Sequence, residues 1–124
     1  MKLISYLYQD QPGWGMVTAD GVSPLGSAQY PTLLSALQAH ALGPLTAAVA
    51  GAAASLQLGD ITFLPVIPAP GKIFCVGHNY EAHRVETARD KTQFPLLFMR
   101  VAESQTAHMQ PIIQPRESTH LDYE

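Results

Sequence analysis

The stretch that decides how this sequence is interpreted runs from Ala69 to His83 and reads APGKIFCVGHNYEAH. Its apolar run, IFCVG, has the composition of a buried strand, and Gly77 ends that run in a turn. The charged residues that follow, between Tyr80 and Lys91, indicate a short helix or helical turn. The sequence therefore predicts a strand, a turn and a helix in close succession.

A proline-rich connector precedes this stretch, with prolines at positions 65, 68 and 70. Proline fixes its own φ and pushes the preceding residue towards extended geometry, so the connector is stiff. Charge is distributed unequally on its two sides, because residues 1–70 hold four charged side chains and residues 71–124 hold thirteen. We therefore predict a small N-terminal domain over residues 1–68 and the beginning of a second domain over residues 69–124.

Composition excludes several classes of protein. The 124 residues are 47% apolar and 14% charged, which favours a packed core over disorder. The net charge of −3 is too small and too dispersed to indicate a nucleic-acid or anionic-membrane partner. Apolar segments are too short for a signal peptide or a membrane span. The single cysteine, Cys75, excludes a disulfide within the chain, so we expect a cytoplasmic protein.

Residues 1–70 are predicted to form an α+β scaffold without chemistry of its own. KLISYLY predicts a strand, and the segment 15–26 predicts a hairpin that turns at Asp20-Gly21. A short helix is expected over 31–41, with Leu33, Leu34 and Leu37 on one face. A second helix is expected to start at Pro44 and to continue as far as Leu56, because small and apolar residues recur there at helical spacing.

The best candidate for catalysis is the pair His83 and Glu86. These residues are three apart, so on a helix their side chains share one face. A carboxylate beside an imidazole fixes its tautomer and stabilises its protonated form, which makes the histidine a better general base. From spacing alone, a solvated surface helix with alternating charges is the better-supported alternative.

A second candidate lies at the end of the sequence, in HLDYE. Strands are predicted over 94–101 and from His120 onwards, with an extended proline-bounded segment between them. On a strand, Asp122 and Glu124 point to the same side, and two carboxylates on one face can bind a hard divalent cation. From spacing alone, the solvated face of an edge strand is the better-supported alternative. The sequence contains no glycine-rich phosphate loop, Cys/His zinc pattern or Ser/His/Asp signature.

In this order, the segments PAPGKIFCVG, GHNYEAH, PLLFMR and PIIQPRESTHLDYE resemble the fumarylacetoacetate hydrolase superfamily. The resemblance is good over residues 61–124 and looser over the first 60. It implies a strand-rich α+β fold. A small N-terminal α+β domain would be followed by the beginning of a mixed β-sheet catalytic domain.

The resemblance also implies roles for individual residues. Glu124 becomes a metal ligand, the first glutamate of a Glu-X-Glu pair whose second member would fall two residues beyond the end of the sequence. His83 becomes the general base or water activator, and Glu86 its orienting carboxylate. The turn Gly77-His78-Asn79 becomes the substrate-binding segment. His78 departs from the family, which usually has leucine or a long basic residue at this position.

The implied activity is that of a Mg²⁺- or Mn²⁺-dependent enzyme, with Ca²⁺ as an alternative, acting on 2-oxo or β-diketo acids. The first expectation is hydrolytic C–C cleavage of the acylpyruvate or fumarylacetoacetate type, as in aromatic catabolism, by a homodimer. Sibling reactions of the same site are oxaloacetate decarboxylation, 2-oxo-acid hydration and tautomerisation. A further alternative is that the 124 residues alone are an inactive N-terminal fragment or an assembly module.

Overall fold

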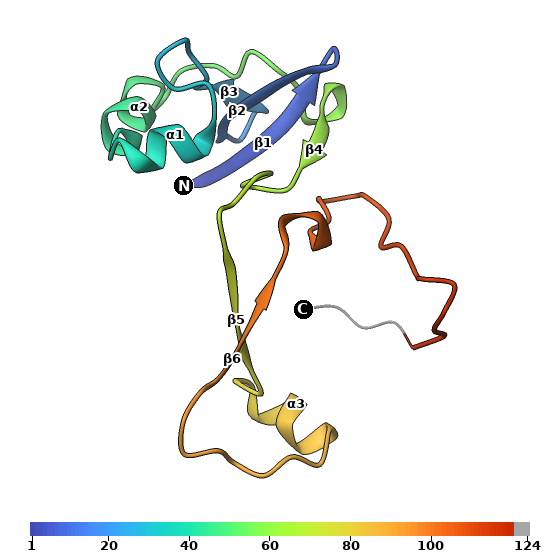
Figure 1. The fold of residues 1–124 in the computed structure, drawn as a ribbon. Coiled ribbons are helices and arrows are strands. Elements are labelled where there is room, and N and C mark those ends of the chain that lie inside the picture. Colours follow the sequence, from blue (N-terminus) through green and yellow to red (C-terminus); the bar gives the residue numbers. More distant parts are fainter. Residues whose placement is uncertain (121–124) are drawn as a thin grey trace. The chain divides into compact units, whose positions relative to one another are not determined.

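The structure is a computed structural model that describes residues 1–120, and the chain forms two compact units (Figure 1). The first unit consists of Met1–Ala69 and Gln105–Ile113. The second consists of Pro70–Ser104 and the segment that starts at Gln114. Helices and strands occur in both units, so the fold is strand-rich α+β, as predicted.

The first unit is built on a four-stranded antiparallel sheet in the order β3-β2-β1-β4. Its strands are β1 (Lys2–Tyr8), β2 (Gln11–Val17), β3 (Val22–Pro24) and β4 (Thr62–Leu64). Gln9 and Asp10 connect β1 to β2, with φ values of 50° and 60°. Two consecutive positive φ values match the twist of a tight hairpin. This hairpin was not predicted, because β2 begins in QPGWG, whose glycines and proline are atypical of a strand.

The hairpin predicted at Asp20-Gly21 is confirmed, with a longer connection than expected. Val17 pairs with Val22, so residues 18–21 form the turn, and the Thr18 N–H donates to the Gly21 carbonyl at 2.9 Å. Gly21 has a φ of 144°, and a Cβ atom there would lie 2.2 Å from the Leu56 carbonyl oxygen. Only glycine fits this position, for both reasons.

Two short helices complete the first unit. α1 (Leu33–Gln38) begins with a capping box, in which the Thr32 hydroxyl accepts from the Ser35 N–H at 3.1 Å and the Ser35 hydroxyl accepts from the Thr32 N–H at 3.2 Å. The apolar face predicted for this helix consisted of Leu33, Leu34 and Leu37, and this prediction is only partly correct. Leu33 and Ala36 are buried, whereas Leu37 is 42% exposed.

α2 (Leu42–Ala48) is much shorter than the helix predicted to reach Leu56. Gly51, with a φ of 77°, lies just beyond its end. Leu56 instead forms a bridge with Val22, exchanging backbone hydrogen bonds of 2.8 and 3.2 Å. The alanine-rich run would bury little apolar area as a helix. The helix therefore ends early, and Leu56 pairs with the sheet instead. A 3₁₀ turn, η1 (Leu58–Asp60), leads from there into β4.

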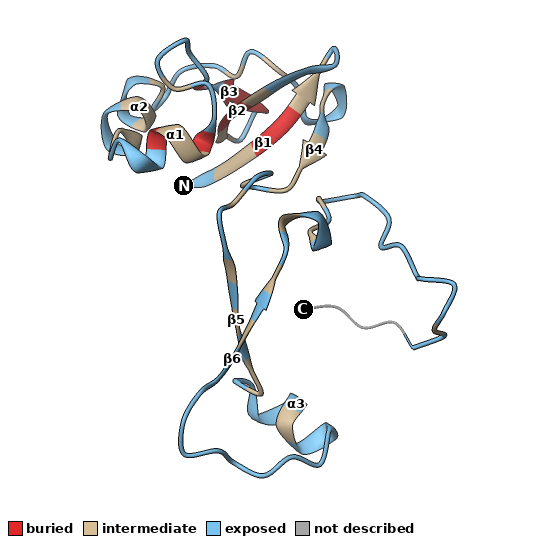
Figure 2. Cartoon of the chain, in the orientation of Figure 1, coloured by how far each residue is buried: buried red, intermediate tan, exposed pale blue. Residues whose placement is uncertain are grey.

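The core of the first unit lies between the sheet and α1 (Figure 2). Trp14 is 1% exposed and packs with Leu25, Leu33 and Ala36. Its indole N–H donates to the Tyr30 carbonyl at 2.9 Å, so the buried polar atom is satisfied. This unit therefore has a hydrophobic core of its own.

The second unit contains a two-stranded antiparallel sheet and one helix. β5 (Ile73–Gly77) pairs with β6 (Leu96–Arg100), and α3 (Glu81–Glu86) lies between them in the sequence. These three elements confirm the prediction for this region. No described side chain of this unit is buried, so β5 is not the buried strand that its composition suggested (Figure 2). Two strands alone provide no second layer to cover it.

The remaining segments are less regular. η2 (Ala102–Ser104) follows β6, and from Gln105 to His120 the chain forms neither helix nor strand. The strand expected in HLDYE falls almost wholly on residues 121–124, which lie outside the described residues. Among residues 1–120, no helix has the length and apolar character needed to cross a bilayer.

Candidate functional site

A cavity of about 440 Å³ lies in the second unit, where β5 ends and α3 begins. Its wall combines the turn after β5 with one side chain of α3 and apolar residues of β6. All three predicted substrate-binding residues and the predicted general base line it. The lining residues are Val76, Gly77, His78, Asn79, Tyr80, His83, Leu96 and Phe98.

The turn at the base of the cavity depends on His78. This residue has a φ of 52°, in the left-handed region that non-glycine residues seldom occupy. Gly77 serves a different purpose, because a Cβ atom there would lie 3.1 Å from Leu96 Cδ2 across the strand pair. Gly77 thus allows β5 and β6 to approach, while His78 makes the turn that directs the chain into α3.

His83 and Glu86 lie on one face of α3, at the spacing that the sequence indicated. His83 Nδ1 is 3.8 Å from Glu86 Oε2, and the two side chains are 46% and 80% exposed. This separation is too long for a hydrogen bond but short enough for electrostatic attraction when the imidazole is protonated. The ring of His78 lies 6.2 Å from that of His83, centroid to centroid.

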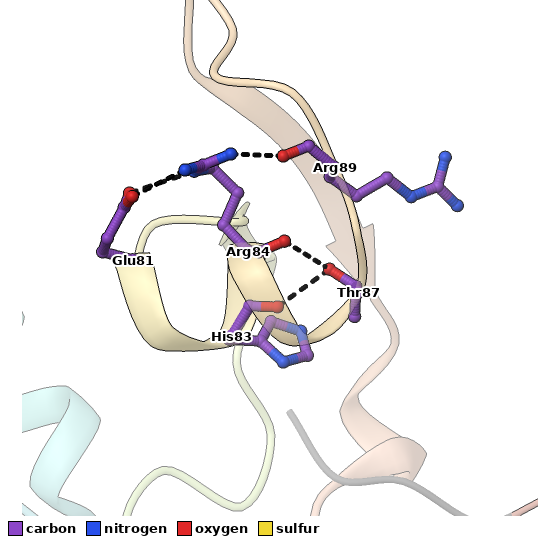
Figure 3. Close-up of polar contacts among 5 residues, drawn as sticks. All are labelled: Glu81, His83, Arg84, Thr87 and Arg89. Carbon is purple, nitrogen blue, oxygen red and sulfur yellow. Dashed lines mark hydrogen bonds and ion pairs between the residues drawn. The ribbon is translucent and has the colours of Figure 1, made fainter.

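Side chains of α3 and of the residues that follow it make several hydrogen bonds that were not predicted from the sequence (Figure 3). The Arg84 guanidinium donates to both carboxylate oxygens of Glu81, at 3.0 and 2.6 Å, and to the backbone carbonyl of Arg89. Hydrogen bonding from Arg84 holds the pKa of Glu81 below its ordinary value, and Glu81 in turn raises the pKa of Arg84. The spacing of Glu81 and Arg84, three residues apart, was a signal for this pair.

The end of α3 is closed by Thr87 and Ala88. The Thr87 hydroxyl donates to the carbonyls of His83 and Arg84, at 2.8 and 3.2 Å. Ala88 adopts a φ of 51°, and the N–H groups of Ala88 and Arg89 donate to the carbonyls of Val85 and Arg84, at 3.0 and 3.1 Å. This is a Schellman ending, with alanine where glycine is usual.

The predicted metal ligand is not placed. Glu124 and its neighbour Asp122 lie outside the described residues. Among residues 1–120, no three His, Cys, Asp or Glu side chains are grouped so as to hold a metal ion.

A second cavity, of about 300 Å³, lies in the first unit and is mostly apolar. His108 borders it and packs edge-on against Phe63, with ring centroids 4.9 Å apart. Gln105 donates to the Ile67 carbonyl at 3.2 Å and joins the segment 105–113 to this unit. His108 is thus a packing histidine.

Comparison with known proteins finds a family match and related sequences. Residues 72–124 match the family described as fumarylacetoacetate (FAA) hydrolase C-terminal. The chain is 29% identical over 126 residues to a 2,4-didehydro-3-deoxy-L-rhamnonate hydrolase of Sphingomonas sp. (strain SKA58), covering 100% of this chain and 42% of that protein. It is 30% identical over 120 residues to the human mitochondrial oxaloacetate tautomerase FAHD2A, covering 91% and 38%.

The chain thus spans about two fifths of the length of these curated relatives. The family match begins at Lys72, one residue before β5, and includes every residue that lines the cavity of the second unit.

Proposed function

The chain belongs to the fumarylacetoacetate hydrolase superfamily, and on this basis we propose that the protein is part of an enzyme acting on 2-oxo or β-diketo acids. The observation that carries the proposal is the cavity of the second unit. The imidazole of His83 lines it, and the carboxylate of Glu86, which is not among the lining residues, lies 3.8 Å from His83 Nδ1. We propose hydrolytic cleavage of a C–C bond, of the acylpyruvate or fumarylacetoacetate type, as the reaction.

His83 is the proposed general base. In hydrolysis it accepts a proton from water while the water oxygen attacks the substrate carbonyl carbon. The C–C bond then breaks, and its electron pair passes to the 2-oxo fragment as an enolate, which takes up a proton. Glu86 is the proposed orienting carboxylate, which would hold the His83 ring in a fixed tautomer and orientation.

The turn after β5 is the proposed substrate-binding segment. His78 and Asn79 both line the cavity, beside Gly77. Imidazole and amide groups can donate hydrogen bonds to carboxylate and carbonyl oxygens, the polar groups of a 2-oxo acid. The apolar side chains of Leu96 and Phe98 suit the carbon chain of the substrate.

A divalent cation, Mg²⁺ or Mn²⁺ with Ca²⁺ as an alternative, is part of the proposal, with Glu124 as one ligand. When bound, such a cation stabilises the negative charge that develops on an enolate oxygen. We further propose that the complete protein acts as a homodimer.

Tautomerisation is the second candidate reaction. It is favoured by the name of one relative, an oxaloacetate tautomerase, and it requires only proton transfer. His83 could move a proton between carbon and oxygen without activating water. Decarboxylation and hydration are further reactions of this class of substrate. An inactive fragment or assembly module is the remaining alternative for the 124 residues alone.

The test is to measure both activities on the purified protein with Mg²⁺ or Mn²⁺. Hydrolysis of an acylpyruvate releases pyruvate and a second carboxylic acid, whereas oxaloacetate tautomerisation changes ultraviolet absorbance without releasing a product. We expect His83→Ala to lower kcat by at least about 100-fold, the contribution typical of a general base. His108→Gln, in the first unit, is the matched control. Equal activity of His83→Ala and the unaltered protein would refute the assignment, and no activity on either substrate would favour the inactive fragment.

A further inference from the structure

α3 is too weak to hold His83 in place by itself. It has six residues, none of them buried, and its N-cap residue, Tyr80, makes no side-chain capping bond. Helices much shorter than about 12 residues are marginal in water unless other contacts support them. The orientation of His83 therefore depends on what supports α3.

The support comes from Arg84, which is the best-covered side chain of the helix. Its side chain is 20% exposed, against 70% for its partner Glu81. Two of its nitrogens bind the two Glu81 oxygens, and a third donates to the Arg89 carbonyl (Figure 3). A single guanidinium thus ties the first turn of α3 to the chain that follows the helix.

The backbone of Arg84 makes a second connection to the same residue. Its carbonyl accepts the Arg89 N–H at 3.1 Å. Residues 84 and 89 are therefore joined once through the backbone and once through the arginine side chain. Between them, Ala88 is held at a positive φ, which an L-residue does not adopt without support.

This closed turn contacts His83 directly. Thr87 lies within it, and both its N–H and its hydroxyl donate to the His83 carbonyl, at 3.0 and 2.8 Å. The same hydroxyl also contacts the Arg84 carbonyl. Any opening of the turn at Arg84 therefore loosens two hydrogen bonds to the backbone of the proposed general base.

We propose that Arg84 is a positioning residue, which closes the turn from Glu81 to Arg89 and thereby holds His83 towards the cavity. This inference rests on the proposed function for its catalytic consequence. Arg84 does not line the cavity, so it acts through the helix and not on the substrate.

The geometry requires arginine. A guanidinium presents several N–H groups in a fixed plane, so it can bind a carboxylate with two hydrogen bonds and still reach a third acceptor. Lysine keeps the charge but has a single nitrogen at the end of a flexible chain. Arg84→Lys is therefore a test of the network that leaves the net charge unchanged.

Arg89 provides the matched control, because it contributes only its backbone to the network. Its side chain extends away from the other residues (Figure 3). Arg89→Ala removes the same charge as Arg84→Ala from nearly the same place and retains the carbonyl that Arg84 binds. Trp14 is the only tryptophan and lies in the core of the first unit, so its fluorescence reports whether that unit stays folded.

The experiment combines amide hydrogen exchange, resolved by NMR, with steady-state kinetics. We expect Arg84→Lys and Arg84→Ala to reduce protection of the Thr87, Ala88 and Arg89 amides. The reduction should be about threefold to fivefold, because a solvent-exposed ion pair contributes little to stability. We expect kcat to fall with KM unchanged, because the substrate-binding turn is not altered. Arg89→Ala should retain both protection and kcat.

The two proposals fail in different ways. If the protein proves inactive on 2-oxo acids, the exchange data still decide whether Arg84 closes the turn. Wild-type protection in Arg84→Ala, or equal loss in Arg89→Ala, would overturn the structural claim. Lost protection with unchanged kcat, in a protein that needs His83, would overturn the positioning claim alone.

Discussion

The rings of His78 and His83 lie 6.2 Å apart and are tilted by 43° to each other. One belongs to the turn after β5 and the other to α3, and both line the same cavity. Because the φ of His78 is positive, the ring of His78 comes close to that of His83 through an uncommon backbone conformation. The identity of residue 78 thus affects both the shape of the turn and the chemistry of the cavity.

Substitutions at His78 should separate these two effects. Asparagine tolerates the left-handed region, so His78→Asn should preserve the turn while removing the imidazole. Valine does not, and His78→Val should destabilise the turn by roughly 1–2 kcal/mol. We expect hydrogen exchange at residues 77–82 to rise in the valine variant only. A fall in kcat/KM in both variants would assign a role to the ring itself, whereas a fall in the valine variant alone would limit His78 to shaping the turn.

Replacement of Ala88 by glycine should stabilise α3. Ala88 adopts a φ of 51° at the end of α3, and glycine removes the steric cost of that conformation, roughly 1 kcal/mol. Ala88→Gly should therefore slow hydrogen exchange of the amides in α3. Ala82→Gly is the matched control, since glycine in a helix interior costs roughly 1 kcal/mol relative to alanine. Faster exchange in both variants would show that the left-handed turn at Ala88 is not formed.

The Glu81–Arg84 pair should make the order of α3 depend on pH. The pKa of Glu81 is lowered from 4.5, chiefly by its hydrogen bonds from Arg84. A group with a lowered pKa stabilises the folded form above its ordinary pKa, and this contribution is lost as the pH falls through the lowered value. We expect the contribution of this pair to be lost, and exchange protection of α3 to fall, below about pH 4.5.

The variant Glu81→Gln should remove that dependence on pH. Glutamine can accept a hydrogen bond from Arg84 but does not titrate, so its weaker pairing should be the same at pH 5 and pH 3. Exchange of the Thr87 and Arg89 amides is the measurement. An equal pH response in the glutamine variant would assign the effect to another acid of the second unit.

The sequence predicted β5, α3 and β6 because each has a strong local signal. Apolar runs bounded by glycine or proline define the strands, and alternating charge defines the helix. The spacing of His83 and Glu86 likewise placed them on one face. These features depend on residues that are close in sequence, and they therefore follow from short patterns.

The features that were missed depend on competition between distant segments. α2 ends early because Leu56 pairs with Val22, thirty-four positions away by residue number. β2 begins in a segment rich in glycine and proline, where pairing with β1 overrides local preference. The left-handed conformations of His78 and Ala88 have no sequence signal, because glycine is the residue that usually marks them.

The exposed face of the β5–β6 sheet leads to the last prediction, which concerns self-association. Phe74 pairs directly with Met99, and these side chains are 63% and 58% exposed. Val76 pairs with Leu97 on the same face, and they are 47% and 59% exposed. Among residues 1–120, each strand of this two-stranded sheet has an unpaired edge, and four adjacent apolar side chains on such a sheet favour contact with another copy.

We expect the sedimentation coefficient of the purified chain to rise with concentration, and we expect Phe74→Lys and Met99→Lys each to reduce that rise. A lysine on the exposed face opposes association through its charge and leaves the strand pairing intact. Thr92→Lys adds the same charge in the exposed loop before β6 and should have little effect. A chain that stays monomeric and soluble at high concentration would contradict the prediction, because the apolar face would then be stable in water without a partner.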